Sequence, residues 1–443
     1  MRAAFPSELR IPAGPSGLHG EWDLTVPGDK SISHRALMLG GLAPGRTQLS
    51  GVLESADCMA TLAAMAQLGV RFERGAESGV YIVDGSGGRL TEPHSAIDCG
   101  NSGTAMRLLA GIMAGQTFPV TLDGDASLRG RPMQRIADPL ALMGAKFEYS
   151  GSLGRAPFTV IGGGLNGIHY QSPTASAQVK SCVLLAGLYA TGATAVTEPL
   201  LSRDHTERML RQLGVAVETT GCTHRLLGTI DDLHPGAIEV PADISSAAFW
   251  MVAAAASPGC RLTLRGVGMN PTRTGLLDVL IRMGAQIEIG PVTAACEGGE
   301  PVADLVIRGG GLRGTAVHED EIPRLVDEVP ILAVAAVLAE GETRIDGAAE
   351  LRVKESDRLS AMARGLVAMG AQIEELPDGL VIQGGGRLRG AELDAGHDHR
   401  IAMSLLMAGL FAEGETRMQG CSFIATSYPG FDLHLAQALE MRK

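Results

Sequence analysis

The chain has 443 residues, of which 45% are hydrophobic and 19% charged, so it is long enough for two packed domains and too apolar for a disordered protein. Its net charge of −12 argues against general binding to nucleic acid or to an anionic membrane, because either would need a basic surface. The seven cysteines form no CxxC pair and the first residues lack the apolar core of a signal peptide, so we expect reduced thiols and a cytoplasmic protein.

Two sequence markers recur along the chain with a similar spacing. Five times an amphipathic segment ends in Leu or Met, then Gly, then Ala or Val, and an alternating strand follows that ends in Glu: 68–73, 143–148, 213–218, 283–288 and 369–374. Six times an apolar stretch ends in a small residue and Gly before a β-prone strand; these glycines, Gly45, Gly115, Gly192, Gly259, Gly341 and Gly414, are 70, 77, 67, 82 and 73 residues apart. Glycine after a helix supplies a left-handed cap, and alternation is typical of a half-buried strand. The chain therefore contains six copies of one α/β unit.

Each repeat is expected to contain an apolar helix, an amphipathic helix and the strands between and after them. The apolar helices have little polar face, so they should be buried on all sides, which suggests two cores of three repeats each. We expect a first domain at 23–241 and a second domain made of 1–22 and 242–443. The sixth repeat lacks its last strand, and a strand near Glu8–Ile11 is a candidate to complete the second domain.

Polar and often cationic residues open the six apolar helices. These openings are 27–35, 100–107, 176–181, 243–246, 327–328 and 398–400. Helix capping explains their Ser, Asn and Asp residues, but it does not require Lys30, Arg35, Gln178 or Arg400. Helix starts also attract anions through their unpaired N–H groups and dipole. We expect three helix starts to converge in each domain, and the two domains to form a polyanion site in the cleft between them.

Further cations lie in the polar loops. Arg129, Arg131 and Arg135 are close together, Arg203 begins another loop, and Lys354 and Arg358 are four residues apart, which would place them on one helical face beside Glu355. A single such cluster is typical of a solvated surface. Recurrence at equivalent positions of the repeats favours an anion site.

Several familiar motifs do not lead to a function. Residues 162–167 and 309–314 match GxGxxG, but neither opens a helix, so we interpret them as hairpin turns and not as a dinucleotide site. The chain has no P-loop motif. His397 and His399 lack further ligands at metal spacing, so no metal and no cofactor are predicted.

Six segments, in order along nearly the whole chain, resemble the signatures of the 5-enolpyruvylshikimate-3-phosphate (EPSP) synthase family. They are 27–35 (PGDKSISHR), 100–104 (GNSGT), 131–133 (RPM), 176–178 (SAQ), 352–359 (RVKESDRL) and 398–400 (DHR). The resemblance implies a two-domain enolpyruvyl transferase fold with six βαβαββ repeats, three per domain, and the active site in the interdomain cleft. It also implies a cofactor-free monomer that transfers the enolpyruvyl group of phosphoenolpyruvate to the 5-hydroxyl of shikimate 3-phosphate by addition and elimination.

The resemblance also implies roles for individual residues. Those for shikimate 3-phosphate are Lys30, Ser31, Arg35, Ser176, Ala177, Gln178, Arg203, Asp327 and Lys354. Those for phosphoenolpyruvate are Lys30, Gly103, Arg131, Gln178, Arg358 and Arg400. Asp327 would take the proton of the 5-hydroxyl, and either Lys30 or Glu355 would protonate the methylene carbon.

The chain departs from many family members in ways that leave its response to glyphosate open. Leu108 replaces a common Pro, and segment 425–429 (ATSYP) stands where many members carry a lysine. With RPM and SAQ, this segment resembles the second class of the family, which includes glyphosate-tolerant bacterial members, whereas Gly103 resembles sensitive ones.

Two other interpretations compete with this one. The sister enzyme that acts on UDP-N-acetylglucosamine shares the fold, but it typically has a reactive loop cysteine and lacks the DKSISHR opening. A non-catalytic repeat scaffold would not concentrate cations at the helix starts.

Overall fold

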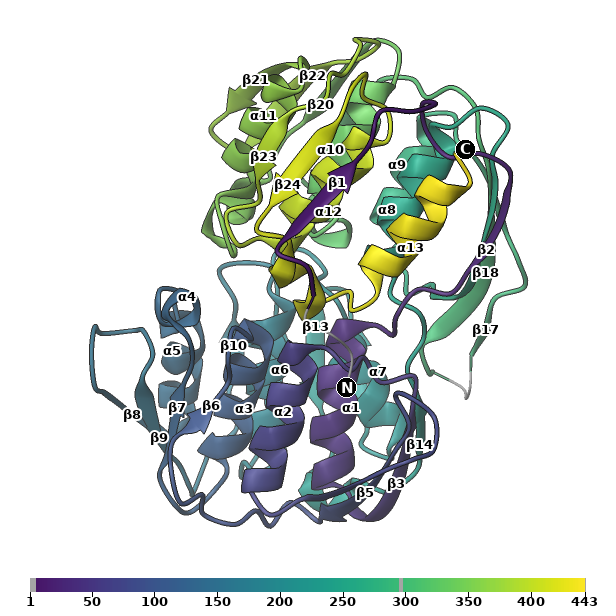
Figure 1. Ribbon diagram of the computed structural model, residues 1–443. Helices are drawn as coiled ribbons and strands as arrows, with labels where there is room; N and C mark the ends of the chain where they lie inside the picture. Colours follow the sequence, from purple (N-terminus) through teal and green to yellow (C-terminus); the bar gives the residue numbers. More distant parts are fainter. Residues whose placement is uncertain (1–4, 295–297, 443) are drawn as a thin grey trace. The chain divides into compact units, whose positions relative to one another are not determined.

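The computed structural model describes residues 5–294 and 298–442 (Figure 1). The chain divides into two compact units, which are described separately. The first unit comprises Gly28–Pro241 and Ala294–Glu300, and the second comprises Met1–Pro27, Ala242–Thr293 and Pro301–Lys443. Residues 23–27, expected in the first domain, belong to the second unit because strand β2 (Glu21–Leu24) pairs in parallel with β15 (Arg261–Gly268).

Where the structure describes it, the first unit contains three four-stranded sheets with one common strand order. Their orders are β14 (Ala237–Glu239), β3 (Pro44–Ser50), β5 (Tyr81–Ser86), β4 (Arg71–Arg74); β6 (Ile97–Asp98), β7 (Val120–Asp123), β9 (Phe158–Ile161), β8 (Lys146–Tyr149); and β10 (His169–Gln171), β11 (Thr194–Thr197), β13 (Thr223–Leu226), β12 (Val217–Thr220). In each sheet the first two strands are parallel and the other pairs are antiparallel.

Apolar and amphipathic helices alternate along the first unit. The apolar ones are α1 (Lys30–Leu42), α3 (Gly103–Ala114) and α6 (Ala177–Gly187), and the amphipathic ones are α2 (Ala56–Gln67), α5 (Gln134–Met143) and α7 (His205–Gln212), with the short α4 (Ala126–Arg129) and η1 (Ile230–Asp232) in loops. Helix α3 packs directly on α6, where a Cβ on Gly111 would lie 2.2 Å from the Cys182 carbonyl oxygen. Glycine is required there because the two backbones approach so closely.

The second unit repeats this pattern with one altered sheet. Its sheets are β16 (Gln286–Ile289), β18 (Pro301–Arg308), β15, β2, with β17 (Thr293–Ala294) on β18; β19 (Ala316–Val317), β20 (Glu342–Ile345), β22 (Gly379–Gln383), β21 (Gln372–Leu376); and β1 (Glu8–Ile11), β24 (Thr416–Gln419), β23 (Glu392–Asp394). Strand β1 pairs antiparallel with β24, from Glu8 opposite Gln419 to Ile11 opposite Thr416, and Figure 1 shows the two side by side. The strand expected from the N-terminus therefore completes the sixth repeat.

In the described part of the second unit, six longer helices and three short turns complete the fold. Its apolar helices are α8 (Ile244–Ala255), α10 (Val329–Leu338) and α12 (His399–Gly409), and its amphipathic helices are α9 (Gly275–Arg282), α11 (Arg358–Ala368) and α13 (Phe431–Glu440). The turns are η2 (Ile322–Arg324), η3 (Ala349–Val353) and η4 (Cys421–Thr426). Every residue of α8 is buried, including Ser245 and Ser246 in its first turn, so this mainly apolar helix has no solvent-facing side.

The glycine markers behave mostly as predicted. The five glycines after the amphipathic helices, Gly69, Gly144, Gly214, Gly284 and Gly370, have φ between 94° and 113°, as left-handed caps require. Gly115 is an exception among the second set, since it caps α3 with φ −80°.

The glycine-rich segments at 162–167 and 309–314 are not hairpins. Segment 162–167 joins β9 to β10, and segment 309–314 joins β18 to β19, so each leads from one sheet to an edge strand of the next. A Cβ on Gly162 would lie 2.1 Å from the Ala114 carbonyl oxygen at the end of α3, and one on Gly309 would lie 1.6 Å from that of Ser257. These glycines therefore let the chain pass close to the end of the buried helix. As predicted, neither segment opens a helix.

Candidate active site

In the second unit, three carboxylates surround one guanidinium where α10, α11 and α12 begin. Arg358, the first residue of α11, is 2% exposed. Its Nε donates to Asp398 at 2.9 Å and its Nη1 to Asp327 at 3.2 Å. Its Nη2 donates to Glu355 at 2.7 Å. Burial lowers the pKa of Arg358, but the three carboxylates outweigh burial and hold it above its ordinary value. The centre of this cluster is therefore a permanent positive charge.

Arg400 adds a second guanidinium to the same cluster. Its Nη1 donates to the Asp327 carbonyl oxygen at 3.2 Å, and its Nη2 lies 3.5 Å from Asp327 Oδ2. The Asp327 carboxylate therefore lies between Arg358 and Arg400. Asp398 caps α12 by accepting the Arg400 backbone N–H at 2.9 Å. Burial raises the pKa of Asp398, but the charge of Arg358 outweighs burial and holds this pKa below the ordinary carboxyl value.

Lys354 lies beside this cluster but not on a helical face with Arg358. It follows the turn η3, and the loop that precedes α11 separates it from that helix, because Asp357 caps α11 through the Ser360 N–H. Its Nζ lies 4.0 Å from Glu350 Oε1. Burial lowers the pKa of Lys354, although Asp327 and Glu350 oppose that effect. The expectation that Lys354 and Arg358 share one helical face is wrong.

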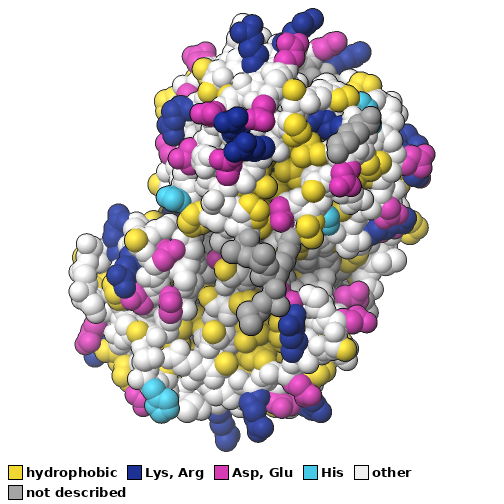
Figure 2. Space-filling model, viewed as in Figure 1, with side chains coloured by type: hydrophobic (Ala, Val, Ile, Leu, Met, Phe, Trp, Pro, Cys, Tyr) yellow, Lys and Arg dark blue, Asp and Glu magenta, His cyan; other side chains and the backbone are white. Residues whose placement is uncertain are grey.

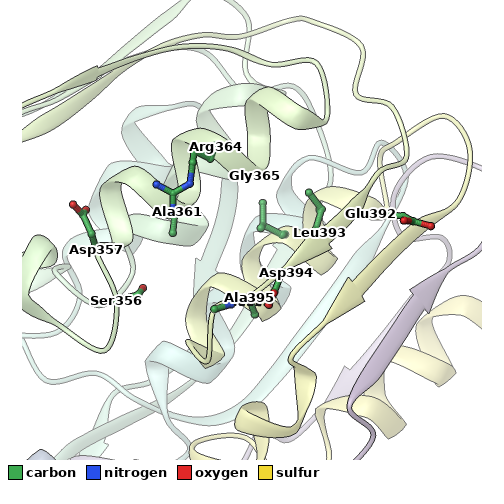
Figure 3. Close-up of a pocket in the computed structure, with 11 residues that line it drawn as sticks. Ser356, Asp357, Ala361, Arg364, Gly365, Glu392, Leu393, Asp394 and Ala395 are labelled. Atoms are coloured by element: carbon green, nitrogen blue, oxygen red, sulfur yellow. Dashed lines mark hydrogen bonds between the residues drawn. The ribbon is translucent and has the colours of Figure 1, made fainter. Parts of the chain in front are cut away.

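A cavity of about 360 Å³ lies in the second unit next to this cluster (Figure 3). Its walls come from α11 and the two residues before it, from β23 and the two residues after it, and from Leu405 of α12. No sequence-predicted site residue lines it. It is connected to the cluster through Ser356, whose hydroxyl donates to Asp398 at 2.9 Å.

In the first unit, the start of α1 holds one partly buried and one fully buried cation. Lys30 Nζ lies 2.5 Å from Asp57 Oδ2 at the start of α2. Arg35 is 3% exposed, and it donates to Thr206 Oγ1 at 2.7 Å, to Ser181 Oγ at 2.7 Å and to the Ser31 carbonyl oxygen at 2.9 Å. Burial lowers the pKa of Arg35 to about 10, against the pull of Glu207. Arg35 thus ties the starts of α1, α6 and α7 together.

The start of α3 joins Gly103 to two buried arginines. A Cβ on Gly103 would lie 3.1 Å from Arg107 Nη1 and 3.3 Å from Arg131 Nη1. Arg107 Nη1 donates to Gln178 Oε1 at 2.5 Å, and Gln178 Nε2 donates to Thr104 at 2.9 Å. Three of the four residues of this unit that were predicted for phosphoenolpyruvate therefore lie close together around Arg107, namely Gly103, Arg131 and Gln178. The fourth, Lys30, pairs with Asp57 instead.

Ser176 begins α6, with Ala177 as the first helical residue. The Ser176 hydroxyl accepts the Val179 N–H at 3.4 Å, which caps the helix. Arg203 lies in the loop before α7 and near enough to Arg35 to lower its pKa. Ser102 Oγ lies 3.4 Å from the ring of His34, so the starts of α1 and α3 also meet. The predicted convergence of three helix starts therefore holds within this unit.

Within the described ranges, no group of three or more His, Cys, Asp or Glu residues has the arrangement of a metal site. No helix in the same ranges is long and apolar enough to cross a membrane. The six cysteines there are free thiols, and Cys296 lies outside the described residues. On the face drawn in Figure 2, Lys and Arg side chains are interspersed with Asp and Glu.

A family model described as EPSP synthase (3-phosphoshikimate 1-carboxyvinyltransferase) matches residues 13–435. The chain belongs to the EPSP synthase family. The 3-phosphoshikimate 1-carboxyvinyltransferase of Acidithiobacillus ferrooxidans is 53% identical over 415 residues, which cover 93% of this chain and 94% of the relative. That of Geobacter sulfurreducens is 51% identical and covers 94% and 95%. As an EPSP synthase family member, the chain is an enzyme of the transferase class.

Solved structures agree with this membership. The EPSP synthase of Acinetobacter baumannii has a TM-score of 0.86 and 47% identity, and it covers 97% of this chain and 98% of its own. The enolpyruvyl transferase NikO of Streptomyces tendae has a TM-score of 0.76 at 18% identity, and covers 98% of this chain and 97% of its own, which shows the shared fold alone. The α/β enolpyruvyl transferase fold is therefore confirmed, and the UDP-N-acetylglucosamine alternative is not favoured.

Sequence reasoning missed the partners that hold the predicted residues. Asp57 pairs with Lys30, Arg107 holds Gln178, and Asp398 holds Arg358. A second buried group joins α8 to α10, where the Ser245 hydroxyl donates to Glu328 and Arg273 donates to Ser245 at 2.6 Å. Position in the repeat was the signal that could have found two of these residues. Asp398 is the cap of α12, and Arg273 lies just before α9 much as Arg358 lies at the start of α11.

Proposed function

We propose that the chain transfers the enolpyruvyl group of phosphoenolpyruvate to the 5-hydroxyl of shikimate 3-phosphate and releases phosphate, as a cytoplasmic monomer of the shikimate pathway. The family membership supports this reaction, and the second-unit cluster around Arg358 is the observation that carries the assignment of residues. Both substrates are polyanions, and guanidinium groups suit carboxylates and phosphates through paired hydrogen bonds.

The proposed binding residues form two sets, one for each substrate, and each set contains residues of both units. Shikimate 3-phosphate would be bound by Lys30, Ser31, Arg35, Ser176, Ala177, Gln178, Arg203, Asp327 and Lys354. Phosphoenolpyruvate would be bound by Lys30, Gly103, Arg131, Gln178, Arg358 and Arg400. Both sets act on one pair of substrates in this proposal. Arg35 contributes mainly by ordering Ser31, because its own donors are engaged by protein groups.

The chemistry is an addition followed by an elimination. Asp327 takes the proton of the 5-hydroxyl as its oxygen bonds to C2 of phosphoenolpyruvate, while an acid protonates the C3 methylene. The resulting tetrahedral intermediate then loses a methyl proton, the C2–O bond to phosphate breaks, and the enol ether forms. Each such proton transfer accelerates a reaction by about 10²–10⁴-fold. Lys30 and Glu355 both stay candidates for the acid, because each has a side chain that can exchange a proton and is held in place by an ion pair.

Substituting Asp327→Asn tests the base. The amide oxygen still accepts from Arg358, so the cluster keeps its shape, but the amide cannot take a proton. We expect kcat to fall by about 10²–10⁴-fold and the KM of shikimate 3-phosphate to change by less than about tenfold. Phosphate release from shikimate 3-phosphate and phosphoenolpyruvate measures this, with UDP-N-acetylglucosamine as the competing acceptor.

Asp278→Asn is the matched control, because Asp278 forms a surface ion pair with Arg324 in the same unit. Its kcat should stay at the wild-type value. If Asp327→Asn kept kcat within a few-fold of wild type, Asp327 would not be the base.

Deuterium uptake separates the two candidate acids. In D₂O, reversal of the addition step places solvent deuterium in the methylene group. Lys30→Met and Glu355→Gln are compared at equal extents of turnover, and the variant that loses deuterium incorporation identifies the acid.

A further inference from the structure

A buried ion-pair cluster lies at the start of α6 in the first unit. Lys180 Nζ lies 2.8 Å from Glu198 Oε2 and 2.9 Å from Glu207 Oε1, and these three side chains are fully buried. The ring of His224 lies 3.3 Å from Lys180 Nζ. Burial lowers the pKa of Lys180, but the two glutamates outweigh burial and raise it. Burying ion pairs often costs as much as it gains, so stability alone does not explain the cluster.

Glu198 connects this cluster to residues of the proposed phosphate site. Its Oε1 accepts the backbone N–H of Ser176 at 2.8 Å. The Ser202 hydroxyl donates to both of its oxygens, at 2.7 and 2.8 Å. Ser176 is the cap of α6, and Ser202 immediately precedes Arg203. One carboxylate therefore fixes two separate segments that carry proposed shikimate 3-phosphate ligands.

Electrostatics alone would not place a carboxylate here. A glutamate close to a phosphate site repels the bound anion, and Lys180 offsets only part of the charge of Glu198 and Glu207. What Glu198 supplies is geometry, because a carboxylate accepts from several donors at once, whereas a carboxamide has one accepting oxygen. Lys180 makes this placement possible by neutralising the carboxylate in the interior.

We infer that Glu198 is a positioning residue for the binding of shikimate 3-phosphate. Its carboxylate orients Ser176 and the Ser202–Arg203 segment from the protein interior, while Lys180 compensates its charge. This inference rests on the proposed assignment of Ser176 and Arg203 to that substrate. The buried ion pair of Glu198 and Lys180 then affects the affinity for one substrate without contacting either reactant.

Two matched substitutions test the inference. Glu198→Gln and Glu207→Gln each remove one buried negative charge that pairs with Lys180, but only Glu198 touches Ser176 and Ser202. If repulsion alone mattered, both variants would bind shikimate 3-phosphate more tightly. Positioning predicts the opposite sign for Glu198→Gln, because the carboxamide cannot accept from Ser176 and Lys180 together.

We expect the Kd of shikimate 3-phosphate, measured by titration calorimetry on the full chain, to rise at least about tenfold in Glu198→Gln. In Glu207→Gln it should stay unchanged or fall. The KM of phosphoenolpyruvate and kcat should stay within about threefold of wild type in both, a split that general destabilisation would not produce. An unchanged Kd in Glu198→Gln, or an equal rise in both variants, overturns the inference.

Two further variants keep the result interpretable. Glu198→Asp retains the charge but is shorter by one methylene, so it cannot span Ser176 and Lys180; its Kd should also rise, and it decides the question if Glu198→Gln does not fold. Ser176→Ala tests the underlying assignment. A raised Kd in Ser176→Ala with an unchanged Kd in both Glu198 variants refutes only the positioning role. An unchanged Kd in Ser176→Ala refutes the assignment of Ser176 itself.

Discussion

Adding one methyl group at Gly103 should weaken the binding of the longer inhibitor glyphosate more than the binding of phosphoenolpyruvate. The new Cβ would lie 3.1 Å from Arg107 Nη1 and 3.3 Å from Arg131 Nη1, closer than a relaxed contact. Both atoms are ends of flexible side chains, so they shift by a few tenths of an ångström and the fold is kept. Gly103 is also the first residue of α3, where alanine favours the helix by about 0.5–1 kcal/mol.

Under the proposed assignment of Gly103 and Arg131 to phosphoenolpyruvate, the cost falls on the anion bound beside Arg131. Overpacking by one methyl group typically costs about 1–3 kcal/mol, which corresponds to about 5- to 150-fold in affinity. We expect Gly103→Ala to raise the KM of phosphoenolpyruvate toward the lower end of that range and the inhibition constant of glyphosate toward the upper end, with an unchanged or slightly higher Tm. Steady-state phosphate release with and without glyphosate measures both constants.

Gly111→Ala is the control in the same helix. There the Cβ would meet the Cys182 backbone oxygen at 2.2 Å, which no side-chain motion relieves. This variant should lose stability and keep the wild-type ratio of the glyphosate inhibition constant to the KM of phosphoenolpyruvate. An unchanged ratio in Gly103→Ala would refute the crowding argument.

Two further predictions concern charge in the second unit. Arg358 holds the pKa of Asp398 below its ordinary value in spite of burial, so the folded protein binds a proton at Asp398 less readily than the unfolded chain does. The stability that Asp398 contributes is therefore present above the ordinary carboxyl pKa, and it is lost as the pH falls through the lower pKa of the folded state. Asp398→Asn should cost about 3–5 kcal/mol in urea unfolding at neutral pH and flatten this acid dependence; an unchanged acid limb would contradict it. Because burial lowers the pKa of Lys354, its ammonium is lost at a lower pH than that of an ordinary lysine, and shikimate 3-phosphate should bind more weakly on the alkaline side. Lys354→Arg should extend binding to higher pH, which calorimetric Kd values across the alkaline range would measure.

Local signals made much of the fold predictable from sequence. The left-handed caps at Gly69 and its equivalents depend on a single residue, and β1 follows from counting the strands of six repeats. The glycine-rich segments were misinterpreted as hairpins because close approach to the end of another helix, as at Gly162 and Ala114, leaves no mark in nearby sequence. Residues 23–27 were placed in the wrong domain because β2 pairs with β15, more than 200 residues away.

The cations of the candidate site were predictable, whereas their partners were not. A cation at the start of a buried helix can be recognised in the sequence, because neither capping nor packing requires a charged residue at that position. The carboxylate that holds it can come from any repeat, as Asp398 does for Arg358 across 40 residues. Arg35 shows the same limit, because its bonds to Ser181 and Thr206 depend on how three helices meet.

The repeated architecture also suggests why the proposed base lies before α10. In the other five apolar helices the residue before the first turn is Asp29, Ser102, Ser176, Asp243 or Asp398, and its side chain accepts a backbone N–H of its own helix. Within the described residues, Glu328 makes no such bond at α10, and Pro330 leaves that first turn with one fewer N–H to satisfy. The carboxylates before α10 therefore turn to other partners, Glu328 to Ser245 and Asp327 to Arg358 and Arg400. The cap position of α10 and the residue before it therefore make contacts between helix starts, and this arrangement places the carboxylate of the proposed base Asp327 between Arg358 and Arg400.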